Sequence, residues 1–201
     1  MAATGVALWG FVIAHLLGNL QVFAGPTKLD DYGRALRSMP SLLWAARLGL
    51  LAAAGAHIVS ALQLLALKAK ARPVGYAKKV PTTSTWASRM MYWSGPVLAA
   101  FIVYHLLDLT LGVVNPGYVE GAVHANLVRS FSRPLVAVFY MLAMAMLWAH
   151  LSHGIWSLFQ TLGFSHPAHM ARLKIASAVI AVVLAGGNIA IVMSVLLGIV
   201  K

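Results

Sequence analysis

The sequence predicts an all-α integral membrane protein with five transmembrane helices, because its composition and its hydropathy pattern agree. Of the 201 residues, 61% are hydrophobic and 9% are charged. The mean hydropathy of +0.83 lies far above that of soluble globular domains. The apolar residues form five runs, each of about 20 residues or more, the length that crosses the hydrocarbon of a bilayer. These runs are residues 4–24, 42–67, 90–114, 135–163 and 175–200.

The connections between the runs are short, so we expect residues 1–201 to form a single membrane domain. The first run, 4–24, has no basic residue before it and no small-residue cleavage pattern after it. This predicts a retained helix rather than a signal peptide. The chain has no cysteine, which excludes disulfides, thiolate-ligated iron–sulfur clusters and covalent c-type haem.

The basic residues, which give a formal net charge of +11, lie between the apolar runs. There they set topology and meet anionic lipid headgroups, so we exclude nucleic-acid binding. The second and fourth connections are basic and lack acids, which predicts that both are cytoplasmic, with the N-terminus on the same side. All four acidic residues then lie toward the outer face. The basic residues of these two connections are Lys68, Lys70, Arg72, Lys78, Lys79, Arg89, Arg172 and Lys174.

Four apolar runs each contain a histidine at depth: His15, His57, His105 and His150. An ionisable side chain inside a bilayer is costly without a partner and is therefore a functional-site hypothesis. At 1.5 Å per residue, His15 and His105 lie roughly 16 to 22 Å from the cytoplasmic side, in the outer half. His57 and His150 lie about 22 to 24 Å from the outer side, in the inner half.

An outer and an inner histidine pair are the minimum set for two bis-histidine b haems, with iron centres on the order of 15 Å apart. Small residues beside three of the histidines let helices and a porphyrin approach closely. The alternative is that small residues merely line helix interfaces and that a histidine bonds a neighbour. The small residues are Ala14, Gly18, Ala53, Ala54, Gly55, Ala149 and Gly154.

At these residues the chain resembles the five-helix, di-haem cytochrome b558-type membrane anchor of succinate dehydrogenases and quinol:fumarate reductases. The resemblance covers nearly the whole chain and rests on the order and spacing of several motifs. They are Thr4-Gly5 leading to His15-Leu16-Leu17-Gly18-Asn19, Trp44-x-x-Arg47 leading to His57, Ser94-Gly95-Pro96 before Tyr104-His105-Leu106, and His150-x-x-x-Gly154-x-Trp156.

The resemblance implies that the first four helices bundle around two stacked haems, His15 with His105 and His57 with His150. It also implies that the chain has no catalytic residue for succinate. The complex that contains it would be respiratory complex II, which takes part in the tricarboxylic acid cycle. The implied partners are a flavoprotein subunit, an iron–sulfur subunit and a quinone, for which menaquinone is the favoured type. The implied location is a bacterial inner membrane, where the complex could form a higher oligomer. Trp148 replaces a glutamate that di-haem fumarate reductases can carry, which puts that proton path in doubt.

Three basic side chains are candidates to bind haem propionates. Arg47 lies about 15 Å outward of His57, at the level of the outer haem, although it could instead snorkel to the interface. Arg89 could serve the inner haem or anchor the topology. His153 could bind a propionate or replace His150 as a ligand, and the resemblance favours His150.

The quinone has two candidate sites, since a headgroup needs an apolar pocket, hydrogen-bond donors and a proton-transferring group. The outer candidates are Asp108, one turn beyond His105, and Gln21 beyond His15. The inner candidates are Ser88, Arg89 and Trp93. We expect the remaining histidines to be ordinary solvated or interface residues: His124, His166 and His169.

Two other functions fit parts of the pattern. The cytochrome b subunit of a hydrogenase or formate dehydrogenase also uses membrane histidines, and would fit if His150 and His153 both served as ligands. A transporter could use the histidines as a proton relay. A haem spectrum separates these classes.

Overall fold

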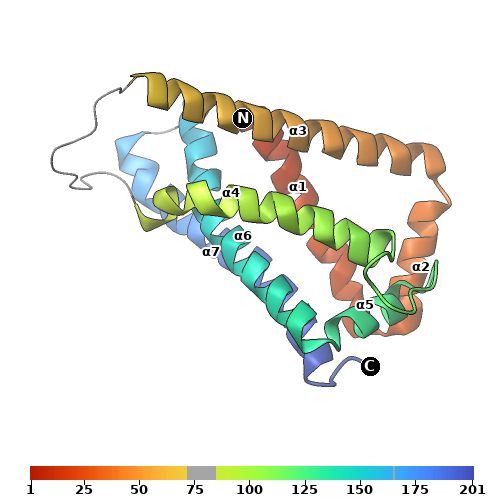
Figure 1. Cartoon of the computed structure of the whole chain (residues 1–201). Coiled ribbons are helices and arrows are strands. Elements are labelled where there is room, and N and C mark those ends of the chain that lie inside the picture. The colour runs from red at the N-terminus through yellow and green to blue at the C-terminus, as the bar shows by residue number, and fades with distance from the viewer. Residues whose placement is uncertain (72–84, 165) are drawn as a thin grey trace.

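The computed structural model describes residues 1–71, 85–164 and 166–201, and every regular element in that part of the chain is helical. Figure 1 shows these helices in chain order. They are α1 (Ala2–Asn19), η1 (Leu20–Ala24), α2 (Pro26–Arg37), α3 (Pro40–Ala71), α4 (Trp86–His105), η2 (Leu106–Thr110), α5 (Val123–Phe131), α6 (Pro134–Thr161) and α7 (Pro167–Leu196).

Five helical segments in the described residues are long and apolar enough to cross a membrane, which confirms the predicted all-helical membrane fold. The predicted third run, 90–114, corresponds to Trp86–Thr110. It ends early because Gly112 adopts a φ of +71°, in the left-handed region that glycine enters without strain. The predicted fifth run, 175–200, corresponds to Pro167–Leu196.

The helix starts follow from caps and prolines rather than from hydropathy. The side chain of Thr85 caps α4 by accepting a hydrogen bond from the backbone N–H of Ser88 at 3.1 Å. Proline occupies the first turn of α6 and of α7, where its missing N–H costs nothing. The helix α7 therefore includes Arg172 and Lys174, which we had expected in a connection.

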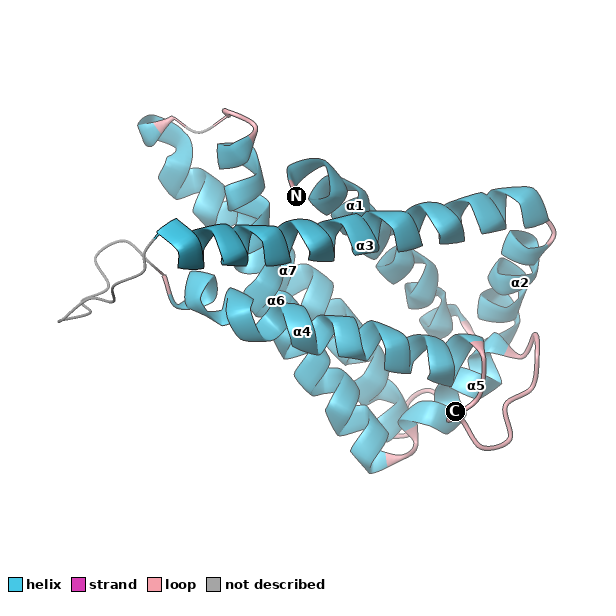
Figure 2. Cartoon of the chain, turned by 45° about the horizontal axis from the view of Figure 1, so that its top comes forward, coloured by secondary structure: helices cyan, strands magenta, loops and turns pink. Residues whose placement is uncertain are grey.

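The most extensive helix contact joins α6 to α7, and the next most extensive joins α4 to α6. Their buried side chains form most of the core, together with Leu16 and Val22 from the first span. By contrast α3 packs chiefly against α1 and α2, and none of its residues is buried. In Figure 2, α3 crosses in front of α7, and α4 lies below it in the view.

The short helices α2 and α5, absent from our expectations, pack against each other at one end of the bundle (Figure 1). The carboxylate of Asp30 accepts a hydrogen bond from the backbone N–H of His124 at 2.8 Å and so caps the start of α5. His124 is 5% exposed, so it is buried rather than solvated. These contacts close the end of the bundle beyond His15 and His105.

Candidate functional site

The four histidines at depth lie as two facing pairs. The rings of His15 on α1 and His105 on α4 have centroids 5.7 Å apart, nearly at right angles. The rings of His57 on α3 and His150 on α6 have centroids 6.4 Å apart. Neither α1 with α4 nor α3 with α6 is among the extensive helix contacts of the described chain. The pairs expected from depth are therefore adjacent across helices that otherwise pack little.

Three of these rings have a hydroxyl beside Nδ1, one of their two nitrogens. Nδ1 of His57 lies 3.1 Å from Oγ1 of Thr4, and Nδ1 of His150 lies 3.2 Å from Oγ of Ser94. Nδ1 of His105 lies 3.4 Å from the phenolic oxygen of Tyr140. When Nδ1–H donates to a hydroxyl, the lone pair lies on Nε2, the arrangement typical of a metal-binding histidine.

The spacing of the rings fits a haem held by each pair. A metal–imidazole bond is about 2 Å long, so two rings across one metal ion have centroids about 6 Å apart. Both observed spacings lie close to that value. A Cβ placed on Gly55 or Gly154, near His57 and His150, would meet no atom within 4 Å. The residues of both pairs thus fit a flat macrocycle with two axial imidazoles.

Gly18 has a different role from the one its place beside His15 suggested. A Cβ at this position would lie 2.7 Å from the ring of Tyr32 on α2. Gly18 is buried, so its small size admits the tyrosine ring. The neighbouring ring contact of His15 is Phe11, stacked at 5.2 Å one turn earlier on α1.

His153 lies one turn beyond His150 but faces other groups. Its ring contacts the indole of Trp156 edge-on, with centroids 5.0 Å apart. Its Nδ1 is buried and has no hydrogen-bond partner among the described residues, as is also true of Oγ of the neighbouring Ser152. His153 is therefore placed to bond a polar group that enters the bundle there.

Arg47 and Trp93 lie on exposed helix faces. The guanidinium of Arg47 stacks over the indole of Trp44 at 5.1 Å from the ring centroid. Within the described residues, Arg47 forms no ion pair with a carboxylate. Trp93 is 70% exposed, while the adjacent Ser94 is fully buried and faces His150. Ser88 is half-buried near the start of α4, and Arg89 is exposed one residue later.

Asp108 lies inside the bundle, at the end near His15 and His105, rather than at its surface. Its side chain is completely buried. Ser130 donates to its carboxylate at 2.5 Å, Tyr140 at 2.9 Å, and Arg133 forms an ion pair with it at 3.0 Å. Within the described chain no hydrogen bond joins Asp108 to the half-buried Gln21.

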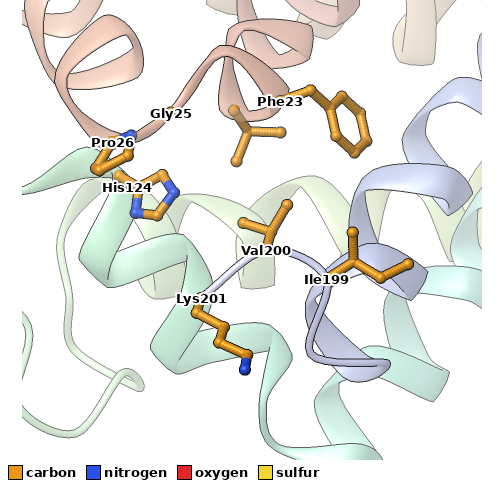
Figure 3. A pocket seen from close by; sticks show the side chains of 8 residues that line it. Phe23, Gly25, Pro26, His124, Ile199, Val200 and Lys201 are labelled. Carbon is orange, nitrogen blue, oxygen red and sulfur yellow. The ribbon is translucent and has the colours of Figure 1, made fainter.

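A cavity of about 240 Å³ lies at the same end of the molecule, between η1, α5 and the residues after α7. Figure 3 shows the side chains of Phe23, His124 and Val200 around it. The other lining residues are Val22, Gly25, Pro26, Ile199 and Lys201.

The sequence analysis did not identify the side chains that contact the histidines, although their estimated depths in the membrane indicate them. Ser94 lies eleven residues before His105, which puts it about 16 Å inward, at the level of the inner pair. Tyr140 lies ten residues before His150 and so about 15 Å outward, at the level of the outer pair. Applying the depth estimate to every polar residue in a span would have found both.

One of three comparisons with known proteins found a match, and it agrees with the membrane fold. The family described as "Succinate dehydrogenase/Fumarate reductase transmembrane subunit" matches residues 68–189. This range contains His105 and His150, one histidine of each pair, and lies after His15 and His57. Comparisons with curated proteins and with solved structures gave no match. Because the match spans more than half of the chain, this protein belongs to the family of succinate dehydrogenase and fumarate reductase transmembrane subunits.

Proposed function

We propose that this chain is the cytochrome b membrane anchor of a succinate:quinone oxidoreductase and passes electrons from an iron–sulfur subunit through two b haems to a quinone. Family membership supports the anchor role. The haem proposal is supported chiefly by the two facing histidine pairs, whose ring centroids are 5.7 and 6.4 Å apart.

His15 and His105 would hold the outer haem, and His57 and His150 the inner one. Bound haem supplies a one-electron redox centre, while the chain supplies its ligands, orientation and surroundings. With two histidines holding each haem, the group would favour electron transfer over oxygen chemistry. Thr4 and Ser94 would hold the rings of the inner pair in the tautomer that offers Nε2.

Propionate contacts would come from side chains near each pair. Arg47 is a candidate for the outer haem because the described chain offers its guanidinium an aromatic partner but no carboxylate. His153 is a candidate for the inner haem because its buried Nδ1 has no partner in the described chain. Arg89, at the inner end of α4, is a further candidate for the inner haem.

The flavoprotein and iron–sulfur subunits would dock on the cytoplasmic side of a bacterial inner membrane, where the N-terminus would also lie. The contact would involve the connection from Lys68 to Arg89 and the segment His166 to Lys174. Residues 72–84 of that connection, with Arg72, Lys78 and Lys79, lie outside the described residues. At this end Lys68 bonds the hydroxyl of Tyr92, and Lys174 lies 4.9 Å from the Trp156 ring centroid.

Menaquinone would exchange electrons at the outer end of the bundle. Asp108 is enclosed there, so its influence on a headgroup would pass through Arg133, whose side chain is 32% exposed. Gln21 would supply a second hydrogen bond. The alternative inner site would use Ser88, Arg89 and Trp93, next to the iron–sulfur subunit.

The pyridine haemochrome assay on the purified complex tests the proposal directly. We expect two b haems per chain. One haem per chain, or none, would contradict the di-haem arrangement.

A further inference from the structure

Tyr140 connects the buried Asp108 to the outer histidine pair. The tyrosine is 4% exposed and lies on α6. Its hydroxyl donates to Oδ2 of Asp108 at 2.9 Å. The phenolic oxygen of Tyr140 also lies 3.4 Å from Nδ1 of His105. Because the single phenolic proton is given to the carboxylate, the oxygen is left to accept the Nδ1–H of His105. The order of donation therefore runs from His105 through Tyr140 to Asp108.

The backbone places Asp108 for this contact. Residues Leu106–Thr110 form a wide π-helical turn directly after His105, closed by a hydrogen bond from the Leu111 N–H to the Leu106 carbonyl at 2.8 Å. Such turns alter the direction of side chains within a helix and occur often at functional sites. Here the turn accompanies a carboxylate that points into the protein.

The carboxylate is held from its other side as well. Ser130 donates to Oδ2 at 2.5 Å, and the Arg133 guanidinium bonds Oδ1 at 3.0 Å. Arg133 also donates to the carbonyl of Val114 at 3.0 Å. A buried carboxylate is tolerated when it is paired and hydrogen-bonded in this way. Asp108 is therefore a buried, ion-paired carboxylate beside the outer pair.

The Tyr140 ring is fixed by aromatic packing. It meets Phe101 edge-on at a centroid distance of 5.1 Å and Phe131 at 4.8 Å. This packing holds the hydroxyl between His105 and Asp108 with little freedom to turn away.

We propose that Tyr140 is a positioning residue for the outer haem, and that it transmits the negative charge of Asp108 to the His105 ring through two hydrogen bonds. This inference rests on the proposed function. A polarised acceptor on Nδ1–H makes the opposite nitrogen a stronger electron donor, which stabilises oxidised iron and lowers the midpoint potential. The inner histidines differ, because within the described residues the hydroxyls of Thr4 and Ser94 that face them form no hydrogen bond with a carboxylate.

The first test is Tyr140→Phe in the complete complex, which removes the hydroxyl and keeps the packed ring. We expect both haems to remain, the midpoint potential of the outer haem to rise, and its low-spin electron paramagnetic resonance signal to shift. The inner haem should be unchanged in both measurements. An unchanged outer potential and signal with both haems bound would overturn the inference.

Tyr104→Phe is the matched control. Tyr104 lies next to His105 in the same aromatic cluster, with its ring centroid 4.9 Å from that of Phe139. Within the described residues its hydroxyl forms no hydrogen bond, so its removal should shift neither haem. A shift equal to that of Tyr140→Phe would show a general effect of the cluster and overturn the specific role of Tyr140.

A double-mutant cycle separates a relay from direct action of the Asp108 charge. If the charge acts through Tyr140, Asp108→Asn should raise the outer potential in the unmodified background and much less in the Tyr140→Phe background. Equal shifts in the two backgrounds would overturn the relay.

A measurement on the unmodified complex covers the case in which Tyr140→Phe fails to assemble. Redox-difference infrared spectra with ring-deuterated tyrosine should show a tyrosine band that changes when the outer haem is reduced. Two haems without such a band would overturn this inference and leave the proposed function intact. A complex without two haems would instead remove the proposed function.

Discussion

The hydroxyl of Ser94 lies 3.2 Å from Nδ1 of His150 and joins α4 to α6. Ser94 is completely buried, so its side chain serves the ring and not the lipid. This contact restrains the orientation of the ring, and in the proposed haem site it would leave Nε2 as the nitrogen for the metal.

We expect Ser94→Ala to weaken the inner haem. Loss of a hydrogen bond to a ligating histidine costs about 10- to 100-fold in metal affinity. Haem loss to an apo-globin acceptor, followed by absorbance, should therefore be faster for the inner haem alone. Ser177→Ala is the control, because Ser177 is similarly buried on α7 but, among the described residues, its hydroxyl bonds just the carbonyl of Leu173. Equal haem loss in both variants would contradict a role for the Ser94 contact.

We expect His150→Ala to abolish the inner haem and His153→Ala to retain it. His150 faces His57 at a centroid distance of 6.4 Å, whereas the ring of His153 contacts Trp156. Haem stoichiometry of the two purified variants provides the measurement. The reverse result, with the inner haem lost only in His153→Ala, would move the ligand by one turn.

Gly187 on α7 controls the approach of α1, which carries His15. A Cβ at Gly187 would lie 2.9 Å from Cδ2 of the buried Leu16. We expect Gly187→Val to destabilise the protein by about 1–3 kcal/mol, typical of overpacking, and to reduce outer haem content. Thermal unfolding followed by haem absorbance measures both effects.

Gly186→Val is the control for that substitution. A Cβ at Gly186 would meet no atom within 4 Å, so the same change one residue earlier should leave the outer haem in place. If both variants lost the outer haem equally, the contact with Leu16 would not be the cause.

The location of quinone exchange is testable with one substitution at each end. With an outer site, Asp108→Asn should lower quinone reductase turnover, and Ser88→Ala should not. Haem content must be unchanged in both variants. The opposite pattern would place the exchange beside the iron–sulfur subunit.

The five apolar helices were predictable because each run reaches the length that a bilayer requires. Helix ends were less predictable, since Pro167 starts α7 well before the apolar residues begin. The basic first turns of α7 are helical because Pro167 and the His166 cap start the helix there. Gly112 likewise ends the third span earlier than hydropathy suggests.

The pairing of the four histidines could be predicted from their estimated depths in the membrane. One depth per residue is enough to sort four side chains into two levels. The surroundings of Asp108 did not follow from sequence. Its partners Ser130 and Arg133 come from the end of α5 and the residue before α6, and a depth estimate does not bring separate elements together. Asp108 also lies in the π-helical turn Leu106–Thr110, which the apolar pattern of the sequence does not predict.

The exposed position of α3 has a consequence for assembly of the protein. Because none of its residues is buried, the second span gains little from packing against its neighbours. A ligand that binds only the folded state stabilises it by about 4 kcal/mol at a thousandfold excess over its dissociation constant. The inner haem, if held between His57 and His150, would therefore link α3 to α6 and stabilise the position of α3. Haem supply during biogenesis would then decide how much of the newly inserted chain survives membrane proteolysis.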